Sequence, residues 1–307
     1  MHRSLIALAA VLALALPALA SPPTSAAATA RPSCVVSLSP TATETLFAIG
    51  AGPQVQAVDK DSNFPSRGLP RKRVDAFNPS VEALLGICRP TAAHPSRTPD
   101  LVVISYDANN IAQKLSGLGV PVVQQDAPAT LGGAYAQMIQ LGRLTGHLRA
   151  AERLVGSLQR RIARDVHSIP AHPGRAISVY YELDPTFYSL TSSTFVGSIL
   201  KSLGTVNIAD AQSTSADAGY PQLSAEYVVS ADPTVIFLAD TLCCHQSAQT
   251  VAARPGFAQV SAVVHHHVYG LDDDIASRWG PRIGQLVDAL TRAIRQTLAD
   301  TRLGPTS

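Results

Sequence analysis

Short apolar runs alternate along this chain with longer segments whose apolar residues lie three and four positions apart. Runs of four or five apolar residues between turn residues are typical of buried parallel strands, whereas the wider spacing is typical of helices. The pattern therefore predicts an α/β fold. The predicted strands cover residues 35–38, 55–58, 101–104, 120–124, 176–181, 206–208, 234–238 and 264–271, and the shorter predicted helices include 109–118, 194–203 and 282–299. After the first strand, Thr41 and Glu44 match a capping box that would begin a helix.

The same local order occurs twice, once in each half of the chain. Asn78-Pro-Ser-Val-Glu82 and Leu223-Ser-Ala-Glu226 each begin a short predicted helix that carries one glutamate near its start. A Pro/Asp turn then precedes an apolar strand, at Pro99-Asp100 in the first half and at Asp232-Pro233 in the second. The duplication predicts two similar α/β lobes, each with one exposed carboxylate.

The segment from Tyr135 to His167 keeps the three-and-four spacing throughout and contains no proline. We expect a single amphipathic helix about 50 Å long, at 1.5 Å per residue, that acts as a rigid strut. The predicted fold class is α/β, with two Rossmann-like lobes of mostly parallel sheets joined by one long rigid helix and a ligand cleft between the lobes. The predicted domains are an N-terminal lobe at 33–134, a connecting helix at 135–168 and a C-terminal lobe at 172–300.

The first 20 residues have the features of a secretory signal peptide. Arg3 precedes an apolar stretch from Leu5 to Leu16, and the small-residue site Ala18-Leu19-Ala20 follows. Residues 21–32 are predicted to be a disordered leader, in which Ala30 ends a second cleavage site. Cys34 follows Ala-Arg-Pro-Ser and not the Leu-x-x pattern of a lipid-anchored cysteine. We therefore expect export, cleavage near Ala20 or Ala30, and a free periplasmic protein.

Charge and motifs argue against two broad classes of function. The 307 residues carry a net charge of +2 without blocks of Lys or Arg, which does not fit nucleic-acid binding. Gly50-Ala-Gly52 lacks the third glycine of a dinucleotide loop, and the chain has no Gly-x-Ser-x-Gly elbow, phosphate loop or His-Glu-x-x-His motif. We predict a monomeric protein that is not an enzyme and has no resident cofactor; a cryptic hydrolase is the alternative, which turnover of a generic ester would reveal.

Four cysteines in an exported chain are candidates for disulfides. Cys34 begins the first strand and Cys88 follows a helix that runs antiparallel to the sheet, so both lie at the same end of one lobe. We predict a bridge between these two. Cys243 and Cys244 are adjacent, and a vicinal bridge between them and a pair of thiols are both left open.

The run His265-His266-His267 is a candidate metal tract. Within a strand, however, the first and third histidines would point to one face and the second to the other, so three ligands would not converge. We therefore predict no metal site here.

Taken in order, these motifs resemble the helical-backbone class of periplasmic substrate-binding proteins, which deliver cobalamin, iron-siderophores or haem to ABC importers. The cobalamin-binding subgroup fits best. The extended interval 86–98 and the sequence Cys243-Cys244-His245 depart from its pattern. The resemblance covers about residues 33–298 and rests on residues 36–44, 78–82, 99–104, the long helix, 223–226 and 277–282.

The resemblance implies a set of residues that contact the ligand. Flat aromatic side chains suit a macrocycle because they bury a large area at small entropic cost, while a few polar groups fix its orientation. The alternative for Phe77 and Tyr188 is that they are ordinary core residues. The implied ligand-binding residues are Phe77 and Tyr106 in one lobe and Tyr188, Asp274, Arg278 and Trp279 in the other.

In this class, one glutamate from each lobe pairs with arginines of the membrane permease, and Glu82 and Glu226 occupy those positions. The simpler alternative is that each only stabilises the start of its helix. The resemblance thus implies a periplasmic protein that captures a corrinoid (cobalamin-like) ligand and delivers it to an ABC importer permease. An iron-siderophore or haem receptor on the same scaffold is the first alternative, and an extracellular sensor or adhesion module is the second.

Overall fold

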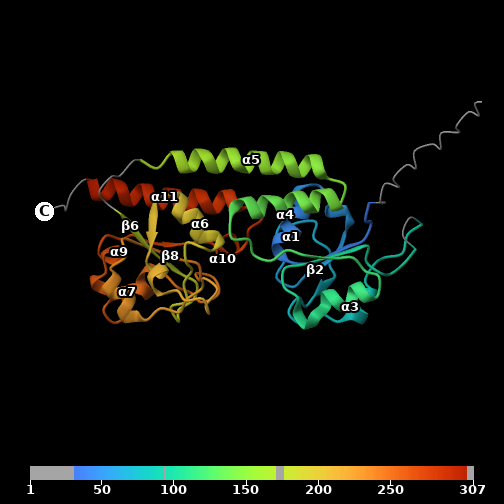
Figure 1. The fold of residues 1–307 in the computed structure, drawn as a ribbon, viewed down its shortest axis with the longest axis horizontal. Helices are drawn as coiled ribbons and strands as arrows, with labels where there is room; N and C mark the ends of the chain where they lie inside the picture. Colours follow the sequence, from blue (N-terminus) through green and yellow to red (C-terminus); the bar gives the residue numbers. More distant parts are fainter. Residues whose placement is uncertain (1–30, 93–94, 171–175, 303–307) are drawn as a thin grey trace, which may run out of the picture. The chain divides into compact units, whose positions relative to one another are not determined.

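The computed structural model describes residues 31–92, 95–170 and 176–302, and Figure 1 shows two α/β lobes side by side beneath a layer of long helices. The predicted signal peptide and nearly all of the predicted leader lie outside these residues. Two sheets form the lobes, and every strand pair in both sheets is parallel. The predicted α/β class, with two lobes of parallel sheets, is therefore confirmed.

The N-terminal lobe contains a five-stranded sheet in the order β3-β2-β1-β4-β5. The central strands β1 and β4 are buried along their whole length because helices cover both faces. Val36 and Val102 pack on one face of the sheet, and Val35 and Val103 pack on the other. The strands are β1 (Val35–Leu38), β2 (Val55–Asp59), β3 (Arg73–Val74), β4 (Leu101–Ile104) and β5 (Val122–Gln124), and the helices are α1 (Pro40–Ala48), α2 (Val81–Leu85) and α3 (Ile111–Gly117).

The C-terminal lobe repeats this plan with a four-stranded sheet in the order β7-β6-β8-β9. Its strands are β6 (Ile177–Glu182), β7 (Thr205–Asn207), β8 (Val235–Leu238) and β9 (Val268–Gly270). Its helices are α6 (Phe195–Ser202), α7 (Ala225–Ala231), α8 (Ala248–Ala252), α9 (Ser261–Val264), α10 (Asp273–Ser277) and α11 (Ile283–Arg302). Among the residues that the structure describes, no helix combines the length and the apolar composition needed to cross a bilayer.

The prediction of one continuous helix from Tyr135 to His167 is wrong. The segment forms two helices, α4 (Leu131–Leu144) and α5 (Leu148–His167). Gly146 has a left-handed φ of 75° and ends the first helix, and the His147 amide then donates to the Gly142 carbonyl at 2.6 Å. The apolar spacing continues through this turn because both helices bury their apolar faces, so the spacing alone does not reveal the break.

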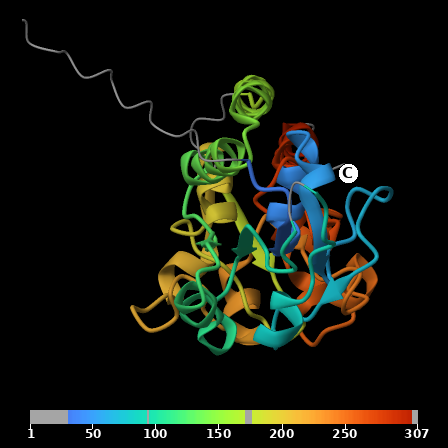
Figure 2. The ribbon, with the colours of Figure 1, turned by 90° about the vertical axis from the view of Figure 1, so that its right-hand side faces the viewer.

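The two helices pack against each other, and α5 also packs against α11. α5 lies outside α4 and α11 in both views (Figures 1 and 2). A Cβ added at Gly142 would lie 2.5 Å from the Ala151 Cβ, so the close approach of α5 to α4 requires glycine at that position. The connection between the lobes is therefore a layer of packed helices instead of a single strut.

The predicted strand at 264–271 is also partly wrong. Helix α9 extends to Val264, His266 has a left-handed φ of 60°, and β9 begins only at Val268. The three histidines therefore occupy a turn, and the argument from strand alternation does not apply to them. The buried His267 ring lies 3.3 Å from the Asp300 carboxylate. Within the described ranges, no group of three or more His, Cys, Asp or Glu side chains is placed to hold a metal ion.

Candidate functional site

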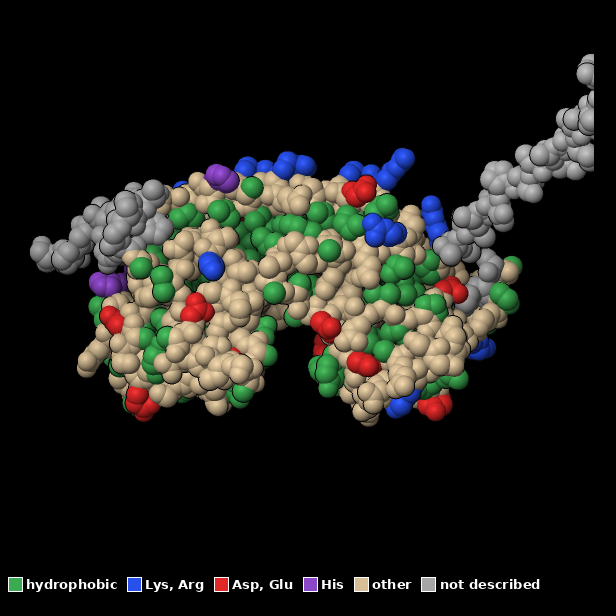
Figure 3. All heavy atoms as spheres, in the orientation of Figure 1, with side chains coloured by type: hydrophobic (Ala, Val, Ile, Leu, Met, Phe, Trp, Pro, Cys, Tyr) green, Lys and Arg blue, Asp and Glu red, His purple; other side chains and the backbone are tan. Residues whose placement is uncertain are grey.

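A polar pocket lies between the two lobes, at the carboxyl ends of the N-lobe strands. Its volume is about 560 Å³. In open parallel sheets this edge is where ligands bind. Figure 3 shows the surface deeply hollowed between the two lobes. The lining residues are Ser39, Pro40, Thr41, Lys60, Asp61, Asn63 and Ser105 from the N-terminal lobe and Asp274, Ser277, Arg278 and Trp279 from the C-terminal lobe.

Beneath this pocket, Glu44 joins the two lobes through arginines. Arg282 donates two hydrogen bonds to the Glu44 carboxylate, at 2.9 and 2.6 Å, and Arg278 donates a third at 2.9 Å. The prediction that Glu44 belongs to a capping box is wrong, because Ser39 caps α1 by accepting from the Ala42 amide. The Glu44 side chain is instead a buried interlobe anchor.

The remaining donors of Arg278 also reach the N-terminal lobe. Its guanidinium donates to the Asn63 side chain at 2.7 Å and to the Asp61 carbonyl at 3.1 Å, and it pairs with Asp274. Asn63 in turn donates to Asp274 at 2.6 Å. We call Glu44, Asn63, Asp274, Arg278 and Arg282 the junction cluster; two arginines balance two carboxylates in it.

Four residues of the junction cluster are charged. Two of these, Asp274 and Arg278, are predicted ligand residues that also line the pocket. The Arg278 guanidinium already donates hydrogen bonds to residues within the chain, so its contact with a ligand stays a prediction. Trp279 also lines the pocket, and its indole donates to the Gln137 side chain of α4 at 2.7 Å. The structure thus brings three of the six predicted ligand residues together.

The other three predicted ligand residues form an exposed aromatic set. Phe77, Tyr106 and Tyr188 have 73%, 64% and 41% of their surface exposed. The interpretation of Phe77 and Tyr188 as core residues is therefore wrong. Each lies in the loop after the carboxyl end of a strand, namely β3, β4 and β6. They lie at the same edge of the sheets as the polar pocket. None of them is among the described residues that line it.

A second buried ionic cluster lies inside the C-terminal lobe, and the sequence analysis missed it. Glu182, at the end of β6, accepts two hydrogen bonds of 2.6 Å from Arg254. Asp240, just beyond β8, is fully buried, and neither carboxylate oxygen has a hydrogen-bond partner among the described residues. Gln246 also accepts from Arg254, at 2.8 Å. We call Glu182, Asp240, Gln246 and Arg254 the C-lobe cluster.

Burial and the neighbouring Glu182 carboxylate raise the pKa of Asp240 to about 7, against which Arg254 acts only weakly. The cluster therefore holds two carboxyl groups and one arginine, and the Asp240 carboxyl is partly protonated near neutral pH. No local sequence motif signals this arrangement, because its residues come from three separate segments of the chain.

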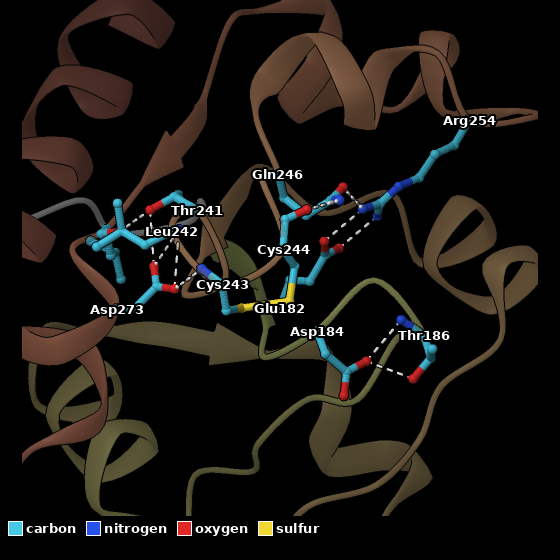
Figure 4. Close-up of a disulfide and its surroundings, with 11 residues drawn as sticks. Glu182, Asp184, Thr186, Thr241, Leu242, Cys243, Cys244, Gln246, Arg254 and Asp273 are labelled. Carbon is cyan, nitrogen blue, oxygen red and sulfur yellow. Dashed lines mark hydrogen bonds and ion pairs between the residues drawn. A yellow bond between two sulfur atoms is a disulfide. The ribbon is translucent and has the colours of Figure 1, made fainter. Parts of the chain in front are cut away.

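The cysteines form two disulfides at opposite ends of their lobes. The predicted bridge between Cys34 and Cys88 is confirmed, with a Cα–Cα distance of 6.0 Å and both residues in the N-lobe core. Cys243 and Cys244, whose state the sequence left open, form a vicinal disulfide in the loop after β8 (Figure 4).

The helices α2 and α7 are closely matched in the two lobes. Ser80 and Ser224 cap them by accepting from the amide three residues later. Glu82 and Glu226 are exposed in the first turns. Hydrogen bonds from the backbone amide and from the capping serine lower the pKa of each glutamate, so both are ionised at neutral pH. The structure thus presents one fixed negative charge per lobe at equivalent positions.

Comparison with known proteins identifies the class to which this fold and pocket belong. The model of the periplasmic binding protein family matches residues 35–275, so the chain belongs to that family. The family consists of extracytoplasmic substrate-binding proteins, in agreement with the predicted class.

Individual relatives are more distant. An uncharacterized ABC transporter substrate-binding lipoprotein, YvrC, of Bacillus subtilis is 27% identical over 86% of this chain and 80% of its own. A cobalamin-binding protein of Halobacterium salinarum is 29% identical over 87% of this chain and 70% of its own.

Solved structures show the same fold. The vitamin B12 binding protein BtuF of Vibrio cholerae has a TM-score of 0.70 at 21% identity, covering 87% of this chain and 98% of that one. The haem-binding protein RhuT of Roseiflexus has a TM-score of 0.72 at 23% identity, covering 86% and 98%. At these identities the likeness establishes the fold and leaves the ligand open.

Proposed function

We propose that this chain captures a corrinoid between its lobes and delivers it to an ABC importer. The observation that carries the proposal is the combination of a polar interlobe pocket with exposed aromatic side chains on the adjoining strand ends. Exposed aromatic residues at such an edge suit a flat, partly apolar ligand. Support for a corrinoid comes from relatives that are named cobalamin-binding or vitamin B12-binding and align with most of the chain.

In this proposal the aromatic and polar residues have different roles. Phe77, Tyr106 and Tyr188 contact the flat faces of the macrocycle, and Trp279 contributes from the pocket wall. Asp274 and Arg278 fix polar groups at the ligand's edge while they hold the lobes together. The metal chelate is cargo, so the chain needs no resident cofactor and performs no catalysis.

A haem or iron-siderophore receptor is the second candidate. It is favoured by the solved haem-binding and iron-binding proteins, whose folds match this chain as well as the vitamin B12 binding protein does. The same aromatic set would accept a porphyrin. A shared scaffold does not decide between these ligands, because the choice of ligand depends on which side chains are placed in the site.

Two measurements decide between the candidates. The absorption spectrum of the protein purified from its native host distinguishes a bound corrinoid, haem or ferric siderophore. Calorimetric titration of ligand-free protein with cyanocobalamin, cobinamide, haemin and a ferric hydroxamate then ranks the affinities. We expect micromolar or tighter binding of a corrinoid, weakened at least tenfold by Tyr106→Ala. If haemin or the hydroxamate binds clearly and neither corrinoid gives a heat of binding, the second candidate function is supported instead.

The proposal extends to the partner and the location. Glu82 and Glu226 would pair with arginines of the permease, one from each lobe, and set the orientation of docking more than its strength. The protein would act as a monomer, independently of nucleic acid, after export and cleavage near Ala20 or Ala30. We propose a form without a lipid anchor, since Cys34 is bridged to Cys88.

A further inference from the structure

The loop that carries the vicinal disulfide occupies the middle of the C-lobe's ligand-facing edge. Strand β8 lies between β6 and β9 in the sheet, and the loop 239–247 follows its carboxyl end. The segments after the two flanking strands contain all of the ligand residues predicted for this lobe: Tyr188 follows β6, and Asp274, Arg278 and Trp279 follow β9. A ligand that touched both segments would therefore pass over this loop.

Three polar groups at the start of the loop form hydrogen bonds within the protein. The Asp273 carboxylate accepts from the Leu242 amide at 3.0 Å, from the Cys243 amide at 2.8 Å and from the Thr241 hydroxyl at 2.9 Å (Figure 4). Asp273 directly precedes the pocket residue Asp274. The Asp273 side chain thus fixes the loop beside the interlobe pocket. It also occupies hydrogen-bond donors that a polar ligand could otherwise use.

At Leu242 and Cys243 the loop leaves an apolar surface exposed, and the exposed His245 lies two residues further on. The Leu242 side chain is 61% exposed, and Cys243 is exposed as well. In the view of Figure 4 the bridge is flanked by Asp273 on one side and by Asp184, in the turn that leads to Tyr188, on the other. Sulfur is polarisable, and the methionine thioether makes favourable contacts with flat conjugated groups such as aromatic rings. The disulfide sulfurs offer a polarisable, apolar surface of the same kind. An exposed leucine beside it adds apolar area but no hydrogen bond.

The loop is also held in one conformation. The covalent bridge closes a ring over two adjacent residues, Gln246 accepts from Arg254, and the Cys244 amide donates to the Asp240 carbonyl at 3.3 Å. A rigid contact loses little conformational entropy when a ligand binds. An exposed apolar surface that is already immobile is therefore well suited to recognition.

We infer that Leu242 and the Cys243–Cys244 disulfide form the central part of the C-lobe wall of the ligand site, where they contact an apolar face of a macrocyclic ligand. The inference rests on the proposed function and sharpens it. A wall of apolar carbon and sulfur favours corrinoid or porphyrin faces over a hydrophilic ferric chelate. It also gives a role to Cys243 and Cys244, which depart from the family pattern.

The test uses the oxidised exported protein and whichever of cyanocobalamin and haemin the wild type binds in calorimetry. Leu242→Asp places a charge on the wall and should weaken binding at least tenfold. The matched control is Leu118→Asp, an equally exposed leucine (57%) that ends α3 away from the cleft, and it should change affinity less than twofold. The double change Cys243→Ser with Cys244→Ser should weaken binding about three- to tenfold, because it removes the sulfur surface and the ring.

The outcomes separate the inference from the function on which it rests. Wild-type affinity in both Leu242→Asp and the double serine variant, alongside a loss in Tyr106→Ala, would overturn the wall and leave the binding function intact. Failure of the wild type to bind either probe would overturn both. Thermal melting of each variant shows whether it folds; Leu242→Asn, which is uncharged, should give an intermediate loss if the wall is correct and none if it is not.

Discussion

The junction cluster and the C-lobe cluster are built from the same residue types, but their charges balance differently. In the junction cluster, Arg278 and Arg282 face Glu44 and Asp274, so two positive charges meet two negative ones. In the C-lobe cluster, Arg254 alone faces both Glu182 and Asp240. The first cluster joins two lobes, and the second lies within one.

The difference follows from the cost of burying charge. A buried carboxylate needs a counter-charge and hydrogen bonds, and one without them takes up a proton instead. Glu44 has three such bonds, whereas the oxygens of Asp240 have no partner among the described residues. The junction cluster is therefore a fixed connection between lobes, and the C-lobe cluster is a group whose charge depends on pH.

The largest expected effect comes from breaking the junction cluster. Glu44→Ala should lower the free energy of unfolding by about 3–5 kcal/mol, because it leaves Arg278 and Arg282 buried without their shared partner. Urea denaturation at pH 7 measures the change. Glu152→Ala, at an exposed glutamate of α5, is the control and should stay within about 0.5 kcal/mol of wild type. A loss below about 1 kcal/mol for Glu44→Ala would mean that the lobes are held mainly by apolar packing.

The next effect concerns the proton on Asp240. Because the pKa of this carboxyl rises from 3.8 to about 7 on folding, the native state keeps a proton that the unfolded chain releases. Stability should therefore fall as pH rises from about 4 to 7. Asp240→Asn stays neutral at every pH, so it should remove most of this slope and be more stable than wild type at pH 8, by about 1–4 kcal/mol.

Denaturation curves from pH 4 to 8 measure that slope. Asp184→Asn is the matched control, since it makes the same isosteric change at a partly exposed carboxylate of the same lobe. It should leave the slope unchanged. An unaltered slope in Asp240→Asn would show that the proton resides elsewhere in the cluster.

The features that depend on a local sequence pattern were predicted most accurately. Strands β1 and β4 are apolar at nearly every position because both faces are buried, and the bridge between Cys34 and Cys88 followed from the direction of one helix. Both ionic clusters depend on contacts across the chain, which leave no such pattern. Glu44 and Arg282 are 238 positions apart, and Glu182 and Arg254 are 72 apart.

The misreading of Glu44 has a specific cause. A glutamate three residues after a threonine matches a capping box whether or not the cap forms, and Ser39 takes the cap position instead. The break at Gly146 was hidden for a related reason, since α4 and α5 bury faces with the same spacing. Whether Phe77 and Tyr188 are exposed likewise depends on which parts of the chain pack over their loops. The amino-acid composition does not determine this packing.

A smaller effect is expected on the arrangement of the lobes. The junction cluster and the helices α4, α5 and α11 connect the lobes at several points, so hinge closure on ligand binding should be slight. Small-angle scattering should show a change in the radius of gyration below about 1 Å when ligand is added. Adding the same ligand to Glu44→Ala, if it folds, should give a larger change. A change of several ångströms in the wild type would contradict a fixed junction.

The smallest effect on binding and stability is expected from changes at Glu82 and Glu226, two exposed carboxylates outside both clusters. Glu82 and Glu226 form hydrogen bonds within their own helix starts, so replacing both with arginine should leave the midpoint of urea denaturation almost unchanged. Ligand affinity should stay within about twofold, because sites without shared partners behave independently.

Uptake should respond in the opposite way to the same double change. If each glutamate meets a permease arginine, the variant places like charges against each other at both contacts, which costs several kcal/mol at an interface. Transport of the labelled ligand into cells lacking the native receptor should then fall to background, while Glu82→Gln with Glu226→Gln, which removes charge without reversing it, should keep partial uptake. Full uptake by the double arginine variant would refute the docking role and leave the two matched helix starts as simple caps.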